Sequence, residues 1–173
     1  MITLLLGFLM YFPVVSIFNG GVELPEKKIE EIKIDKQKFV DRHNYYRDKV
    51  NVPKVEWSDE IASYAQEWAN QLALSCQLKH RSGNDGYGEN ICMAPISYDE
   101  EKVVDIWASE EAKFNHNDPV FRHKDLYKYG HYSQLIWRKT ERIGAGAAKC
   151  SHGSTIWVCN YDPPGNYIDQ KVY

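Results

Sequence analysis

The sequence predicts a layered α+β domain in which helices pack on a small and mainly antiparallel sheet. Three observations support this fold class. The chain of 173 residues is 43% hydrophobic and holds five Trp, which is typical of a packed domain and not of a disordered chain. Apolar residues recur at helical spacing in several segments before Phe114. Two β-like runs then flank a turn near the C-terminus.

The N-terminus has the pattern of a secretory signal peptide. The first fifteen residues carry no charged side chain, and their apolar run from Leu4 to Phe12 is short for a bilayer span. Small residues follow at Ser16 and then at Gly20 and Gly21, so we assign residues 1–20 to a cleaved signal peptide. An uncleaved anchor is the alternative. We therefore expect a secreted, extracellular protein.

A charged segment, residues 21–35, leads into the predicted domain, residues 36–173, and we expect it to be loosely ordered. The domain opens with a helix over Lys36–Val50, which Pro53 follows. A second helix starts after Ser58, a favourable N-cap that precedes two acidic residues. Its apolar positions are Ile61, Ala65, Trp68 and Leu72. This spacing predicts an amphipathic helix packed on a core.

Shorter elements complete the predicted domain. They are a strand over Gly88–Ala94, a third helix over Asp99–Phe114, a loop over 115–129, and two strands over 142–149 and 155–161. The turn sequence Ser151–Ser154 joins the last two strands and predicts a hairpin.

Four cysteines allow three disulfide pairings, and a secreted protein can keep disulfides. Cys150 and Cys159 flank the hairpin turn, so we expect them to face each other and to pair. Cys76 and Cys92 then form the second pair. A disulfide that closes this loop stabilises the folded state by up to ~3 kcal/mol in the chain-entropy model. The alternative is that Cys76 and Cys92 are free thiols.

The charge balance excludes some partners. The net charge is −3 and the isoelectric point is about 6.1. Neither value gives an electrostatic reason to bind nucleic acid or an anionic membrane surface.

Two histidines and two glutamates stand out as candidate site residues: His80, Glu89, Glu110 and His131. Imidazoles and carboxylates in equal number can ligate a metal, act as acid and base, or satisfy one another by hydrogen bonding. Their spacing in the sequence does not show whether the four residues meet in the fold.

Five segments, taken in order, resemble the signature motifs of the CAP superfamily, which includes cysteine-rich secretory proteins, antigen 5 and pathogenesis-related proteins. The segments are Cys76–His80, Tyr87–Ile91, Trp107–Glu110, Gly130–Trp137 and Cys159–Asn166. The resemblance extends from about His43 to the C-terminus and implies a three-layer α-β-α sandwich with a central cleft.

The resemblance also implies roles for single residues. His80 and His131 match the family's divalent-metal ligands, usually for zinc, and Glu89 and Glu110 match the acidic residues that support them. The next three residues, Tyr132, Ser133 and Gln134, would line or buttress the cleft. Two imidazoles make a weak zinc site, and acid would release the metal.

The sequence departs from the family pattern at two positions. Relatives with more cysteines carry a Cys where this chain has Ala145, and the resemblance implies that this Cys pairs with the one aligned to Cys76. Ser133 stands where Thr is more usual, and the hydroxyl is kept.

The resemblance favours a non-enzymatic secreted protein that binds or carries a sterol or a fatty acid. Pro95, Ile96 and Tyr98 lie in an apolar, aromatic segment that would suit contact with such a lipid. One alternative is an effector or interaction protein that contacts extracellular or host-cell proteins. The other is a weak metal-dependent hydrolase, in which Glu89 or Glu110 activates a metal-bound water.

Overall fold

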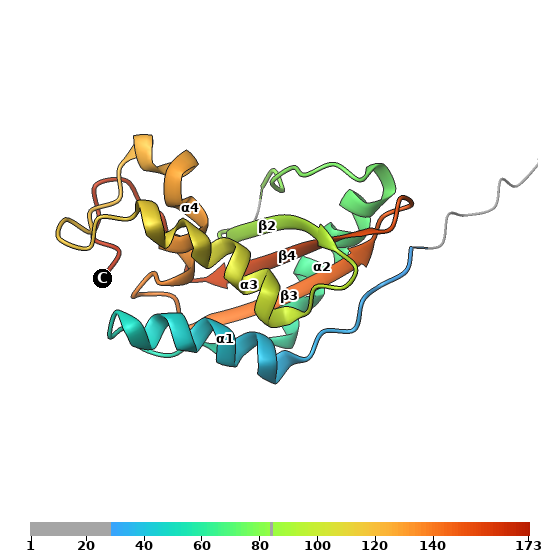
Figure 1. Ribbon diagram of the computed structural model, residues 1–173, viewed down its shortest axis with the longest axis horizontal. Coiled ribbons are helices and arrows are strands. Elements are labelled where there is room, and N and C mark those ends of the chain that lie inside the picture. Colours follow the sequence, from blue (N-terminus) through green and yellow to red (C-terminus); the bar gives the residue numbers. More distant parts are fainter. Residues whose placement is uncertain (1–28, 84) are drawn as a thin grey trace, which may run out of the picture.

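The computed structural model describes residues 29–83 and 85–173, so the predicted signal peptide lies outside the described residues. The helices and strands are α1 (Lys36–Lys49), β1 (Glu56–Trp57), α2 (Asp59–Ser75), β2 (Gly88–Pro95), α3 (Glu100–Ala108), α4 (Leu126–Leu135), β3 (Arg142–Lys149) and β4 (Ser154–Asp162). Two 3₁₀ helices, η1 (Ser109–Lys113) and η2 (His123–Asp125), lie between α3 and α4 (Figure 1). None of the described helices is long and apolar enough to cross a membrane.

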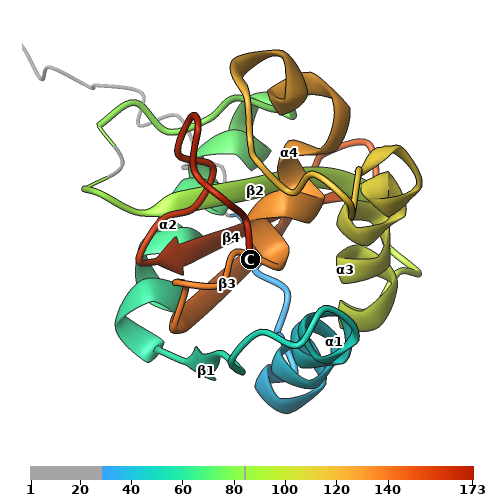
Figure 2. The ribbon, with the colours of Figure 1, turned by 90° about the vertical axis from the view of Figure 1, so that its left-hand side faces the viewer.

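The four strands form one mixed sheet in the order β1-β3-β4-β2. β1 pairs parallel with β3, and the other two pairings are antiparallel. Figure 2 shows α2 on one side of the sheet and α1 and α3 on the other. The predicted α-β-α sandwich with a mainly antiparallel sheet is therefore confirmed.

β4 is buried on both faces because helices cover both sides of the sheet. Ile156 and Val158 belong to the core cluster beneath α2. Trp157 and Tyr161 point the other way, into the larger cluster that α1, α3 and α4 share. Because both of its faces are buried, the sequence of such a central strand is a nearly continuous run of hydrophobic residues.

α2 packs unusually close to β3. A Cβ atom on Gly144 would lie 2.1 Å from the backbone nitrogen of Ala62, and one on Gly146 would lie 2.2 Å from the Cα atom of Gln66. Both clashes involve the helix backbone, which cannot move aside as a flexible side chain does. The two glycines therefore set the distance between the helix and the sheet.

Arg47 ties α1 to the end of α4. Its guanidinium is fully buried and donates to the carbonyls of Pro53 at 2.7 Å, Leu135 and Trp137 at 3.0 Å, and Thr140 at 2.9 Å. Burial lowers the pKa of Arg47 to about 10, so the group stays charged at neutral pH. A charge-assisted donor fixes the last turn of α4 against the first helix.

Local signals in the sequence located most elements well. Ser58 caps α2 as predicted, with its hydroxyl accepting from the Ile61 N–H at 3.4 Å. The predicted third helix is shorter than expected, because it changes to the 3₁₀ turn η1 after Ala108. The helix α4 was not predicted, and its first residues fall in the expected loop 115–129.

The described part of the predicted lead-in is held against the edge of the sheet instead of being loosely ordered. Glu31 forms an isolated bridge with Ala148, and the Ile32 N–H donates to the Ala147 carbonyl at 2.9 Å. The Lys149 N–H donates to the carbonyl of Glu30 at 2.9 Å. Backbone hydrogen bonding therefore extends the domain to about residue 30.

The predicted disulfide pairings are wrong. Ala145, not Cys150, lies opposite Cys159 in the hairpin, so about five residues, or roughly 17 Å of strand, separate the two cysteines. Cys92 packs in the cluster beneath α1 and α3, whereas Cys76 packs against the cluster on the α2 side. The sheet therefore lies between Cys76 and Cys92.

Cys76 instead lies beside Cys150. Their sulfur atoms and a ring nitrogen of His152 all lie within 4.8 Å of one another. Cys92 and Cys159 are buried thiols on the other side of the sheet, and burial raises the pKa of Cys92 to about 12. A buried thiol with a raised pKa reacts slowly.

We expect disulfide mapping of the oxidised protein to link Cys76 with Cys150. Mass spectrometry of the protein alkylated in its folded state should find Cys92 and Cys159 unmodified, and denaturation should expose both thiols. A Cys76→Ser variant is the control, since the linked peptide should be absent from it. A peptide linking Cys150 to Cys159 would contradict the observed hairpin register.

We expect Gly146→Ala to lower the free energy of unfolding by about 1–3 kcal/mol, because the added methyl group forces α2 away from the sheet. Urea denaturation followed by circular dichroism measures the change. Ser63→Ala, on the exposed side of α2, serves as the control and should cost well under 1 kcal/mol. Equal stability of the two variants would show that α2 adjusts freely.

Candidate metal-binding cleft

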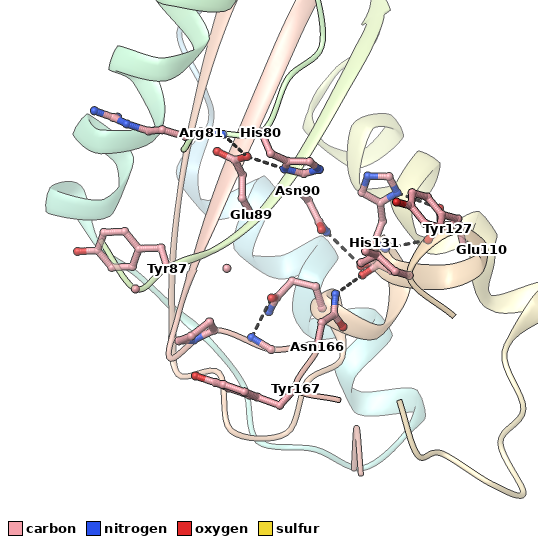
Figure 3. A pocket seen from close by; sticks show the side chains of 17 residues that line it. His80, Arg81, Tyr87, Glu89, Asn90, Glu110, Tyr127, His131, Asn166 and Tyr167 are labelled. Carbon is pink, nitrogen blue, oxygen red and sulfur yellow. Dashed lines mark hydrogen bonds and ion pairs between the residues drawn. The ribbon is translucent and has the colours of Figure 1, made fainter. Parts of the chain in front are cut away.

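A cleft of about 760 Å³ opens at the end of the sheet where β2 begins (Figure 3). Its walls come from the loop after α2, the first residues of β2, η1, α4 and the loop after β4. All four candidate residues line it: His80, Glu89, Glu110 and His131. Folding thus brings together side chains that lie up to 51 residues apart in the sequence.

The first pair joins a loop to a strand. Nδ1 of His80 donates to Oε1 of Glu89 at 2.6 Å, and the backbone N–H of Arg81 donates to the same oxygen at 3.2 Å. The side chain of Glu89 is only 3% exposed, whereas that of His80 is 64% exposed. The buried carboxylate therefore holds an exposed imidazole at the wall of the cleft.

The second pair depends on a break inside α4. Tyr129 has non-helical angles, φ −149° and ψ 29°, so the chain starts a new helical turn after it. The N–H groups at the start of such a turn lack helical partners. Oε2 of Glu110 accepts from the N–H groups of His131 and Tyr132, at 2.9 and 3.2 Å. Oε1 accepts from Nδ1 of His131 at 2.8 Å, so one carboxylate caps the turn and orients the imidazole.

Both imidazoles have the same orientation relative to their carboxylates. Because a carboxylate accepts hydrogen bonds, the proton of each neutral ring sits on Nδ1, and Nε2 carries the lone pair. Neither Nε2 atom has a protein partner among the described residues, and the two rings project into the same space in Figure 3. Metal-ligating histidines commonly donate their second ring N–H to a carboxylate in this way.

The donor set fits a weakly held divalent ion and not a closed structural site. Glu89 and Glu110 use oxygen atoms to orient His80 and His131, which leaves two nitrogen ligands, and water would complete the coordination. Among the residues that the structure describes, the one cluster of three possible ligand atoms within 4.8 Å is that of Cys76, Cys150 and His152, outside the cleft.

Of the three residues expected to line or buttress the cleft, Gln134 lines it, and Tyr132 and Ser133 do not. Tyr132 and Ser133 are fully buried, because their positions on α4 face the core. The Ser133 hydroxyl donates to Oδ1 of Asn166 at 2.6 Å, which supports the cleft from behind. A buried hydroxyl in this arrangement cannot act as a nucleophile on a ligand in the cleft.

Several lining residues were not predicted. Asn166 ties the loop after β4 to α4 by donating from Nδ2 to the Gly130 carbonyl at 2.8 Å. Tyr127, which is 88% exposed, and Tyr167, which is 46% exposed, stand at the mouth of the cleft. Asn166 belongs to the last signature segment, so the sequence carried a signal for it, whereas the two exposed tyrosines lie outside the signature segments and carry no such signal.

The predicted lipid-binding segment lies elsewhere. Pro95 ends β2, and Ile96 and Tyr98 follow it in the turn before α3. None of the three lines the cleft. β2 runs from the cleft at Gly88 to Pro95, a distance of about 23 Å for seven residues, so the two regions are separate.

Comparison with known proteins supports the resemblance read from the sequence. Residues 40–161 match the model of the cysteine-rich secretory protein family, CAP. The chain is 37% identical over 160 residues to a pathogenesis-related protein 1 of Arabidopsis thaliana, covering 92% of this chain and 93% of the relative. It is 36% identical to pathogenesis-related protein 1A of Nicotiana tabacum, covering 79% of this chain and 80% of the relative.

Solved structures share the fold. The crystal structure of NaASP2 with Zn²⁺ matches with a TM-score of 0.71 and 24% identity, over 86% of this chain and 88% of that one. The structure of BmVAL-1 matches with a TM-score of 0.68 and 25% identity, over 90% of this chain and 85% of that one.

Proposed function

Because this chain belongs to the cysteine-rich secretory protein (CAP) family, we propose that it is an extracellular, non-enzymatic protein whose cleft binds a divalent metal ion through His80 and His131. One observation carries the proposal. Each imidazole donates from Nδ1 to a carboxylate and presents Nε2 to the same cleft. The apolar N-terminal sequence and the secretory family support export from the cell.

Zinc is the ion that best suits these ligands. Neutral imidazole is a good ligand for zinc, and NaASP2, which shares the fold, is described with Zn²⁺. With two protein ligands and water, the ion would be held reversibly. Such an ion could bridge the cleft to an oxygen or nitrogen atom of an extracellular partner.

A binding role agrees with the state of the acidic residues. A general base must be able to reach a water or a substrate proton. Glu89 is 3% exposed and Glu110 accepts three hydrogen bonds from protein groups, so each is committed to holding a histidine. This commitment favours the non-enzymatic function over the hydrolase alternative.

A second candidate function is contact with a sterol or a fatty acid at the turn Pro95–Tyr98. Ile96 is 52% exposed and Tyr98 is 37% exposed, although both are apolar enough to prefer burial. If no lipid binds, an effector role through protein contacts becomes the favoured function.

We expect isothermal titration calorimetry to detect zinc binding by the oxidised wild-type protein at neutral pH. His80→Ala and His131→Ala should each weaken it by at least about tenfold, because each removes one of two nitrogen ligands. Affinity should fall in acid, since a protonated imidazole cannot bind a metal. His152→Ala is the matched control, because it alters only the cluster outside the cleft, and its affinity should equal that of the wild type. If His152→Ala loses zinc binding while His80→Ala and His131→Ala keep it, the zinc belongs to the cluster outside the cleft.

We expect organic extracts of the purified protein to contain sterol or fatty acid in near-stoichiometric amount by mass spectrometry. Ile96→Asn should reduce the amount severalfold, because it places an amide where the lipid would pack. Ile168→Asn, at a similarly exposed position of 48% in the loop after β4, should leave it unchanged. Lipid-free extracts from repeated wild-type preparations would rule out this candidate.

A further inference from the structure

The two halves of the cleft come from different elements, so something must fix the distance between their imidazoles. His80 is held by Glu89 of β2, and His131 lies on α4. Asn90 follows Glu89 directly, and its Nδ2 donates to the carbonyl of His131 at 3.1 Å (Figure 3). The first residues of β2 thus contact both histidines, one through Glu89 and the other through Asn90.

Asn90 is itself held by a buried chain of hydrogen bonds. Its Nδ2 also donates to the hydroxyl oxygen of Tyr161 at 3.0 Å, and that hydroxyl lies 3.0 Å from Nε2 of His43. Nδ1 of His43 lies 2.9 Å from the Phe39 carbonyl. Asn90 is 1% exposed, and Tyr161 and His43 are fully buried.

The directions of these hydrogen bonds follow from the acceptors. A carbonyl can only accept, so His43 carries its proton on Nδ1, and its Nε2 accepts from the Tyr161 hydroxyl. Burial lowers the pKa of His43 to about 3, which keeps the ring neutral and the chain intact. Because the Tyr161 hydroxyl donates its hydrogen bond to His43, its oxygen can accept one from Asn90. The amide of Asn90 therefore has one orientation, with both Nδ2 protons used.

We propose that Asn90 is a positioning residue that sets the separation of the His80 and His131 imidazoles, so that one ion can contact both. The proposal rests on the proposed metal-binding function. His131 is also held by Glu110, but η1 and α4 carry that pair together, so it fixes the orientation of the ring and not its distance from β2. Among the described hydrogen bonds, the bond from Asn90 is the one that links β2 side chains to His131.

The test compares zinc affinity in Asn90→Ala and in the wild type by calorimetry. We expect affinity to fall about 10–100-fold, as is usual when a residue that supports a metal ligand is lost. Asn90→Leu fills the space left by the amide but has no donors, so it should show a similar loss. Asn44→Ala is the matched control, since Asn44 is also a buried amide bonded to backbone groups, at Val55, and does not line the cleft. It should lose stability and keep its zinc affinity.

A metal-free measurement separates this proposal from the one on which it rests. The carbonyl-carbon NMR shift of His131 should change in Asn90→Ala and Asn90→Leu and stay constant in Asn44→Ala. If the wild type binds zinc and both Asn90 variants bind it equally well, Asn90 does not position the site. If the wild type binds no zinc, the metal-binding function fails, and an unchanged His131 shift would overturn the positioning role as well.

Discussion

The cleft depends on keeping two carboxylates hydrogen-bonded, one buried and one partly exposed, since the side chain of Glu89 is 3% exposed and that of Glu110 is 21% exposed. A buried carboxylate without partners costs several kcal/mol, so its surroundings must supply donors. Glu89 takes its donors from His80 and the backbone after it, and Glu110 takes its donors from His131 and a freshly started helical turn. These hydrogen bonds form only when both imidazoles stand at the cleft walls, and the second, buried oxygen of Glu89, Oε2, has no hydrogen-bond partner among the described residues. The shape of the site therefore follows from holding the two carboxylates in hydrogen bonds with the two imidazoles.

Local signals were sufficient for most of the fold. The N-cap Ser58 located the start of α2, and the turn at Ser151–Ser154 located the hairpin, because such signals act within a few residues. α4 was missed, since Gly130 lowers helix propensity and Tyr129 breaks the helix in the middle. Its stability comes from contacts with distant groups such as Glu110, which no local pattern reveals.

The site could be predicted only in part. Spacing alone did not bring His80 to His131, and the family resemblance was needed to suggest that they meet. The predicted cysteine pairing depended on the register of the hairpin strands and failed. A shift of one residue in this register changes both the residue opposite a side chain and the face of the sheet to which the side chain points. Cys150 and Cys159 were expected to pair, yet Cys159 lies opposite Ala145. Ser133 was expected to line or buttress the cleft, and its place on α4 turns it inward, where it contacts Asn166 behind the cleft.

The length of β2 has a further consequence. The cleft lies at its first residue and the exposed apolar turn lies beyond its last, so an ion at one end and a lipid at the other would not touch. The ion and the lipid could then be bound at the same time, and neither would have to leave before the other binds. Because the strand between them is paired along its whole length with β4, it offers a rigid spacer and little means for one guest to sense the other.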